Sequence, residues 1–185
     1  MDKGAENYSR FLAGDDHGLY EIIREYKDGL ILYINSIVAN LHTAEEVAED
    51  TFVKICLKRP RYVRSGSFKT WLYTIGKRLA LDRLRQEKRT GTVPMELCPE
   101  QADEQAELYR NYLRREQRRM LLQAMAQLPT AYRQVLWLTY FEGFDHRQTA
   151  AVMGKTVHGI DTLVYRARNA LKQNLIKEGF EYEEF

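Results

Sequence analysis

The chain has 185 residues, enough for one medium domain or two small ones, and 44% of them are hydrophobic, which is ordinary for a globular protein. No apolar run approaches the ~18 residues that a membrane-spanning helix needs, which excludes that kind of protein. Cys56 and Cys98 form no CxxC pair or disulfide framework, and no basic stretch followed by an apolar run stands at the N-terminus. We therefore expect a cytoplasmic protein without a signal peptide.

Charge is spread unevenly along the chain, although the net charge is only +2. Residues 1–50 hold 4 Lys/Arg and 11 Asp/Glu, whereas residues 51–90 hold 12 Lys/Arg and 2 Asp/Glu. A strongly basic block suits phosphates, and an acidic block suits a basic protein surface. The pattern predicts two different partners.

The first half of the chain has the apolar periodicity of helices. Residues 5–41 repeat apolar side chains at helical spacing. Thr43 and Glu46 form a predicted capping box that opens a helix ending near Arg59, before Pro60. Ser67 is then expected to cap a long basic helix that runs to Arg89.

The second half begins with a segment, 90–103, that has lost this periodicity and contains glycine and two prolines, as linkers do. Helices are expected over 104–128 and 130–142, with Gly143 just past the end of the second. Asp145 and Gln148 predict a capping box, and a last helix should run from about Thr156 to Gly179. The predicted fold class is all-α, with two small helical domains (1–89 and 104–185) joined by the linker.

The helix after Thr43 carries an acidic face. Glu46, Glu49, Asp50 and Val53 fall together, which makes an apolar side chain ringed by carboxylates and a plausible dock for a basic protein helix. A solvated outer face with one stray valine is the alternative, and it is the more common situation.

The long basic helix has two faces. One is a core-facing stripe that includes Phe68. The adjoining face combines Trp71 with arginines, a pattern that suits phosphates and unpaired bases. A solvated charged face with a half-buried Trp71 is the alternative. Asp82 is expected to pair with Arg78 or Arg85.

A helix-turn-helix is predicted over 146–168. Ala150 is small where two helices would meet, and Gly154 stands in the turn where a positive φ is expected. One stripe of the second helix should be buried, namely Ile160, Val164, Ala167 and Leu171. The opposite face would meet DNA, and it carries His158, Asp161, Thr162, Tyr165, Asn169 and Lys172. A plain helical hairpin is the alternative.

Enzyme chemistry finds no support in the sequence. Gly154-Lys155-Thr156 mimics the end of a phosphate-binding loop, but Thr149 stands where that loop needs a glycine. The four histidines lack metal-ligand spacing, and no nucleophile–base constellation is readable. We expect no catalytic residue, no metal and no cofactor.

With these residues in view, the chain resembles bacterial RNA polymerase sigma factors of the extracytoplasmic-function group over about residues 8–176. AEEVAEDTFVK at 44–54 is similar to the segment that docks on the polymerase. SFKTWLYTI at 67–75 and LDRLR at 81–85 are similar to the segment that opens and reads the minus-ten element. LPTAYRQVLWLTYFEG at 128–143, the helix-turn-helix and YRAR at 165–168 are similar to the domain that reads the minus-thirty-five element.

The resemblance implies core RNA polymerase and promoter DNA as partners, and adds an anti-sigma factor as a candidate partner. With Val53, the polymerase-docking residues would be Glu46, Glu49, Asp50 and Phe52. The minus-ten residues would be Tyr62, Ser65, Ser67, Phe68, Trp71, Lys77, Arg78 and Arg85. The minus-thirty-five residues would be Thr156, His158, Asp161, Thr162, Tyr165, Arg168, Asn169 and Lys172.

The sequence departs from the group at four positions. Relatives usually carry Asn at Arg78 and an aliphatic residue at Lys155, and often Lys and Arg at Asp161 and Leu163. The last two departures lower the positive charge at the groove, so we expect weaker nonspecific DNA affinity and an altered promoter preference. Asp161 would either accept from a cytosine amino group or pair with Arg168.

The competing hypothesis is an autonomous helix-turn-helix regulator, which would commonly dimerise on a palindrome. Such a protein needs neither the acidic helix nor the Trp71 helix. These two helices therefore favour the sigma factor.

Overall fold

The computed structural model describes residues 2–63, 66–90 and 118–178, and within these ranges every regular element is a helix. The first group of helices comprises α1 (Lys3–Leu12), α2 (His17–Val38), α3 (Leu41–Lys58) and α4 (Phe68–Thr90). The second group comprises a helical stretch at 118–126, α6 (Thr130–Leu136), the π-helix η1 (Trp137–Phe141), α7 (His146–Met153) and α8 (Val157–Lys177). The expected all-α class is confirmed. Ser65, the linker beyond residue 90 and the start of the predicted 104–128 helix lie outside the described residues.

The start of α3 differs from the sequence prediction. Its N-cap is Asn40, whose side chain accepts from the Thr43 backbone N–H at 2.9 Å, so Thr43 lies inside the helix. Asn is a stronger N-cap than Thr, and Ala39 adopts a left-handed φ of 56° that ends α2 just before it. The Thr43–Glu46 capping box was therefore wrong. Glu46 is left to contact another helix instead.

The start of α4 confirms the predicted cap and adds a second one. Ser67 Oγ accepts from the Thr70 N–H at 3.2 Å. The carboxylate of Asp2 accepts from the Phe68 N–H at 2.7 Å with one oxygen and from the Ala5 N–H at 3.1 Å with the other. One side chain thus caps both α1 and α4, which ties the N-terminus to the start of the basic helix.

The helix-turn-helix forms as its local signals predicted. Asp145 and Gln148 make the capping box of α7, Gly154 ends α7 with a φ of +67°, and Thr156 caps α8. The predicted 130–142 helix is present, but its last turn is the π-helix η1, followed by Gly143 at φ +68°. The last helix ends at Lys177, two residues before the expected end.

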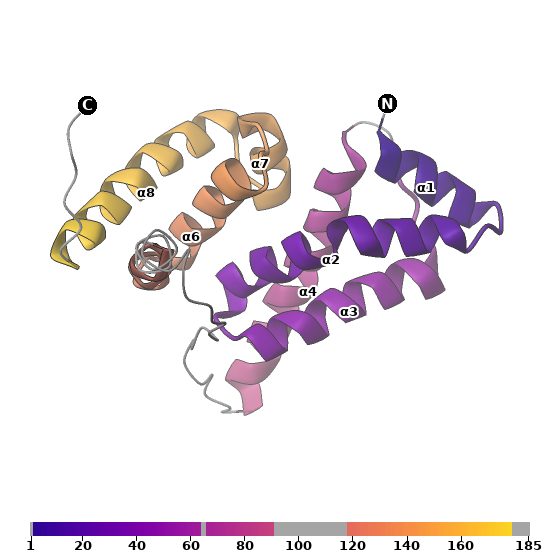
Figure 1. Ribbon diagram of the computed structural model, residues 1–185, viewed down its shortest axis with the longest axis horizontal. Helices are drawn as coiled ribbons and strands as arrows, with labels where there is room; N and C mark the ends of the chain where they lie inside the picture. The colour runs from indigo at the N-terminus through magenta and orange to yellow at the C-terminus, as the bar shows by residue number, and fades with distance from the viewer. Residues whose placement is uncertain (1, 64–65, 91–117, 179–185) are drawn as a thin grey trace, which may run out of the picture.

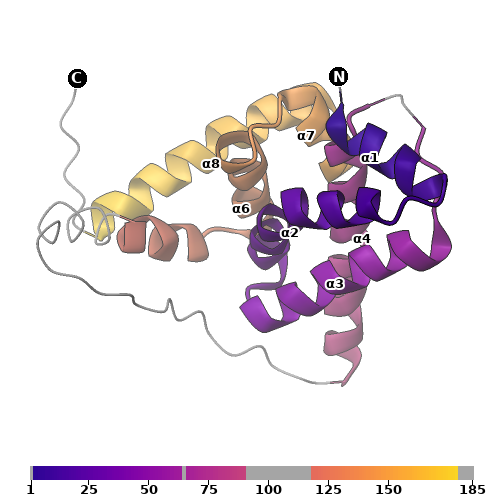
Figure 2. The same cartoon turned by 45° about the vertical axis from the view of Figure 1, so that its right-hand side comes forward.

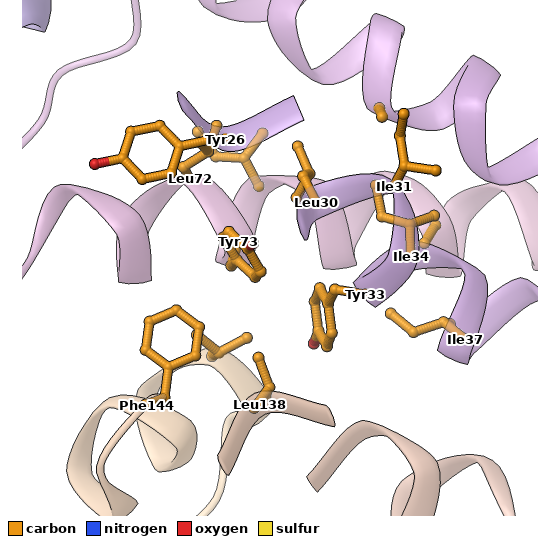
Figure 3. Packing of buried hydrophobic residues seen from close by; sticks show 14 of the residues in the cluster. Tyr26, Leu30, Ile31, Tyr33, Ile34, Ile37, Leu72, Tyr73, Leu138 and Phe144 are labelled. Carbon is orange, nitrogen blue, oxygen red and sulfur yellow. The ribbon is translucent and has the colours of Figure 1, made fainter. Parts of the chain in front are cut away.

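The two helix groups pack directly against each other (Figures 1 and 2). In the described residues, the buried side chains form one continuous hydrophobic cluster that runs from α1 to α8. Figure 3 shows the junction, where Tyr33 of α2 and Tyr73 of α4 face Leu138 of η1 and Phe144. The Tyr73 and Phe144 rings meet edge-on, with centroids 5.2 Å apart. The core is therefore shared between the groups.

Candidate nucleic-acid interface

The acidic face of α3 lies on the surface, and an apolar patch lies beside it. Glu49 and Asp50 are exposed, and Val53 is 50% exposed. Leu57, one turn further on, is 73% exposed and extends the apolar patch, which sequence reasoning missed. Phe52 is only 7% exposed and packs into the core, so it anchors α3 rather than facing outward.

Glu46 of the same face links α3 to the basic helix. Its Oε2 lies 2.7 Å from Nη2 of Arg83, whose Nε binds Glu87 at 3.1 Å. The hydrogen bond to Glu87 is the largest cause that raises the pKa of the Arg83 guanidinium above its usual value. The contacts with Glu46 act in the same direction. The predicted docking helix and the predicted DNA helix are thus joined by an ion-pair network.

Trp71 belongs to a cluster of aromatic rings at the start of α4. Its ring centroid lies 5.2 Å from Tyr8, 5.4 Å from Tyr62 and 5.3 Å from Phe68. Phe68 is fully buried, whereas Trp71 and Tyr62 are half-buried at the edge. The Tyr62 hydroxyl donates to the Gly66 carbonyl at 2.5 Å. Packing therefore fixes one side of Trp71, and part of its surface stays accessible.

The cations of α4 divide into an outward and an inward set. Arg78 and Arg85 are exposed, and Asp82 pairs with Arg85 at 2.6 Å, as one of the two predicted partners. Lys77 points the other way: its Nζ donates to the carbonyls of Val152 and Met153 at 3.1 and 2.7 Å. Burial, and then the charges of Lys155 and Arg78, lower the pKa of Lys77. In this arrangement the ammonium of the half-buried Lys77 contacts the end of α7.

The outward face of α8 is open along its length. His158, Tyr165, Arg168 and Asn169 are exposed, and Tyr165 is 69% exposed. Lys172 lies on the same helix surface, Thr162 is half-buried, and Thr156 is the N-cap. In the predicted buried stripe, Ile160, Val164 and Ala167 are buried and Leu171 is partly buried.

The partner of Asp161 differs from the expected one. Its Oδ1 lies 2.5 Å from Nδ1 of His146, at the start of α7, and no ion pair joins it to Arg168. His146 and Asp161 lie at the N-terminal ends of the two helices, which the tight turn brings together. The contact ties one helix of the motif to the other and leaves Arg168 exposed.

Sequence reasoning missed the residues that join the two helix groups. Glu142 Oε2 accepts from the Tyr73 hydroxyl at 2.6 Å and lies 2.9 Å from Lys69 Nζ. Burial, together with the charge and hydrogen bond of Glu142, raises the pKa of the Tyr73 hydroxyl, so it remains a donor. Arg133 Nε also donates to the Ser36 carbonyl at 3.0 Å. These partners lie about seventy or more positions apart, beyond any local pattern.

Neither a metal site nor a membrane-spanning helix is found in the part of the chain that the structure describes. Within 2–63, 66–90 and 118–178, no three His, Cys, Asp or Glu side chains gather as a metal site would require. The same ranges contain no helix long and apolar enough to cross a bilayer.

Two family models match the chain, and several curated proteins resemble it. The family model for sigma-70 region 2 matches residues 22–90, and that for sigma-70 region 4 matches residues 118–171. The sigma factor SigW of Bacillus subtilis is 25% identical over 179 residues, covering 88% of this chain and 91% of SigW. YlaC, a sigma factor of the same organism, is 27% identical over 160 residues, covering 85% and 91%.

Solved structures share the fold. The sigma factor RpoE of Bartonella quintana, crystallised with the anti-sigma factor NepR, matches with a TM-score of 0.66 at 21% identity, over 84% of this chain and 95% of that one. CnrH, in complex with the cytosolic domain of CnrY, matches with a TM-score of 0.63 at 22% identity, over 95% and 97%.

A helical fold with an exposed acidic helix, a basic aromatic helix and an open helix-turn-helix, matched by both regional models, defines a protein of the sigma-70 family. Within that family the chain belongs to the extracytoplasmic-function group. It is a sigma factor that binds core RNA polymerase and directs promoter-specific transcription initiation. The family is in general not enzymatic.

Proposed function

We propose that this sigma factor works through three surfaces on two domains, residues 1–89 and 104–185, joined by residues 90–103. The observation that carries the proposal is the open face of α8 on one group, together with the exposed acidic and apolar face of α3 on the other. A protein that tethers two DNA-contacting domains on one polymerase needs little affinity from either alone, because tethering raises the effective concentration of each.

The α3 surface is proposed to dock on the polymerase. Glu49 and Asp50 supply charge for a basic partner helix, and Val53 supplies exposed apolar area between them. Leu57 extends this area by one turn. Phe52 holds the helix in place from the core side, and Glu46 contributes while it also pairs with Arg83.

The α4 surface is proposed to hold the opened minus-ten strand. The free edge of Trp71 suits stacking with an unpaired base, and Arg78 and Arg85 suit the phosphates. Tyr62 and Ser67 flank the loop that would receive a flipped base, and Ser65 is assigned to it by sequence alone. Phe68 packs against Trp71, with their ring centroids 5.3 Å apart.

The α8 surface is proposed to read the minus-thirty-five element. The N-terminal part of a recognition helix reaches base edges, whereas its later turns reach phosphates. His158, Asp161 and Thr162 would then read bases, with Thr156 at the helix start. Tyr165, Arg168, Asn169 and Lys172 would contact the backbone. Asp161 Oδ1 already contacts His146 Nδ1, so reading a base would compete with this contact.

An anti-sigma factor is proposed as a regulatory partner, supported by the fold shared with RpoE, a sigma factor solved in complex with an anti-sigma factor. We also propose that the chain acts in the cytoplasm, where RNA polymerase lies, and that it has no catalytic activity of its own.

The test is transcription in vitro with purified core polymerase on a randomised promoter pool. We expect the full chain to select a defined two-part promoter, and the Glu49→Lys/Asp50→Lys variant to lose polymerase binding at least tenfold. Glu178→Lys is the matched control, because Glu178 is an exposed carboxylate on the other helix group. A chain that binds a duplex palindrome as a dimer without polymerase would instead be an autonomous regulator.

The Asp161→Lys variant tests the proposed role of the recognition helix. It replaces an acceptor by a cation, so we expect tighter binding to unrelated DNA with a steeper salt dependence. The promoter selected from the pool should change at the minus-thirty-five element only. An unchanged affinity and an unchanged selection would remove Asp161 from the reading face.

A further inference from the structure

A groove of about 280 Å³ lies within the second helix group, between the helical stretch at 118–126, the α6–η1 segment and α8. Its lining is mostly apolar and includes Met125, Tyr140 and Phe141. Arg168 and Lys172 of α8 supply its two cations. The surfaces proposed above use these two cations for DNA but leave the apolar part of the groove without a role.

The π-helix η1 holds two aromatic rings at the groove. The Phe141 ring stacks on that of Trp137, with centroids 4.4 Å apart and planes 9° apart, which fixes its position. Tyr140 is nevertheless 58% exposed and Phe141 48% exposed. Short π-helices are rare and frequently occur at functional sites, and neighbouring apolar side chains left on a surface commonly mark a binding site. The groove therefore has the features of a site for an aromatic ligand.

The segment that follows α8 has the composition that such a groove would bind. Residues 179–185, which lie outside the described residues, have the sequence GFEYEEF, with three aromatic and three acidic residues and no Lys or Arg. Aromatic rings would fill the apolar part of the groove, and carboxylates would pair with Arg168 and Lys172. The segment and the groove are thus complementary in both charge and apolarity.

The same segment is long enough to reach the groove. Six residues separate Lys172 from Glu178, which is about 9 Å along a helix. Residues 179–185 span about 23 Å when extended, so they can turn back along α8. A tether this short raises the effective concentration to the millimolar range, so even a weak contact would be occupied for much of the time.

We propose that residues 179–185 dock in this groove and mask Arg168 and Lys172 from the phosphates of the minus-thirty-five element. The inference rests on the proposed function of α8. The docked segment and DNA need the same two cations, so the chain binds DNA weakly until the segment is displaced. Residues 179–185 are then a competitor for DNA that is built into the chain.

The docking is tested on the full chain by NMR of methionine methyl groups labelled with carbon-13. Met125 lines the groove, and an aromatic ring placed nearby shifts a methyl resonance. We expect the Phe180→Ser/Tyr182→Ser/Phe185→Ser variant to move the Met125 resonance. The resonance of Met153, at the end of α7, should stay where it is and provides the internal control.

The masking is tested by the affinity of the same proteins for duplex DNA at fixed salt. The triple serine variant keeps all three carboxylates, so an increase in affinity cannot come from a change in net charge. We expect an increase of about threefold to tenfold, as for a site that is masked about 70–90% of the time. Tyr140→Ala removes one side of the groove and should change affinity in the same direction. Tyr20→Ala, a 57% exposed tyrosine on the first group, is the matched control and should have no effect.

A charge reversal separates docking from a general loss of folding. The Glu181→Lys/Glu183→Lys/Glu184→Lys variant should undock and move the Met125 resonance. Adding Arg168→Glu and Lys172→Glu restores opposite charges, so the resonance should return toward its wild-type position. Circular dichroism checks that every variant retains its helix content.

Different results would overturn the docking and the masking. A Met125 resonance that is the same in the wild type and the triple serine variant would show that residues 179–185 do not occupy the groove. A resonance that moves with protein concentration instead would assign the groove to a second copy of the chain. Docking without any change in DNA affinity would show that the segment does not mask α8. Failure of every protein, wild type included, to direct initiation would count against the proposed function, while the Met125 resonance would still decide the docking.

Discussion

The two helix groups handle their DNA-facing residues in opposite ways. In the first group, α4 is both a central core helix and the proposed minus-ten reader, so Phe68 is buried and Lys77 is engaged at the junction. In the second group, α8 buries one stripe and leaves Tyr165 and Arg168 exposed. A helix that is packed on several sides has few exposed side chains that could contact DNA. The first group therefore exposes fewer of its proposed DNA-contacting residues than the second.

The largest difference between the two helix groups should be the amount by which one substitution lowers the free energy of unfolding. Phe68 is fully buried among Tyr8, Tyr26, Tyr62 and Trp71, so Phe68→Ala should lower the free energy of unfolding by about 3–5 kcal/mol. Tyr165→Ala, on exposed α8, should change it by less than about 0.5 kcal/mol. Urea unfolding measures both. Because the core is continuous, we expect a single unfolding transition. A second transition that Phe68→Ala leaves unchanged would show that the two helix groups unfold separately.

When promoter binding is measured in place of stability, the larger effect should come from the second helix group. Tyr165→Ala should weaken binding of the polymerase–sigma complex to a promoter by about 1.5–3 kcal/mol, because the hydrogen bond from the exposed Tyr165 hydroxyl to a charged phosphate would be lost. Tyr20→Ala is the matched control, since Tyr20 is a 57% exposed tyrosine on the first group. Filter binding at fixed salt tests the pair. Equal losses from both substitutions would show that α8 is not the reader.

The turn of the helix-turn-helix depends on backbone conformation alone. Gly154 has a φ of +67° and open space around its missing Cβ, so Gly154→Ala should cost roughly 1–2 kcal/mol of stability without any clash. Gly66→Ala is the control, because Gly66 also has open space but lacks a positive φ. Thermal unfolding distinguishes them. If the two variants melted alike, strain in the turn would not be the cause.

The smallest effect is expected at the exposed ion pair on α4. Asp82 and Arg85 have side chains 63% and 69% exposed, so Asp82→Asn should alter stability by less than about 1 kcal/mol. The same change frees Arg85 for phosphate, so DNA affinity should rise slightly and its salt dependence should steepen. Titrations at two ionic strengths check this. A weaker affinity would mean that Asp82 positions Arg85 for its contact.

Local sequence signals predicted the helices and several of their ends. Ser67, the Asp145–Gln148 box and Gly154 act within three or four residues, so their effect could be predicted from spacing alone. Prediction failed at Thr43 because Asn40, a competing cap nearby, takes that role. The surface residues Glu49, Asp50, Arg78 and Tyr165 were also placed outward correctly, because helical periodicity separates a polar face from an apolar one.

Which side chains meet across the chain depends on the packing of helices that lie far apart in the sequence. The resemblance implied that Lys77 contacts minus-ten DNA, and the structure shows it bound to the end of α7. Asp161 pairs with His146 and not with Arg168. Glu142 showed no local signal at all, although it joins Lys69 and Tyr73. Periodicity assigns a residue to a face of its own helix. Which distant element covers that face depends on how whole helices pack, and that is a property of the complete core.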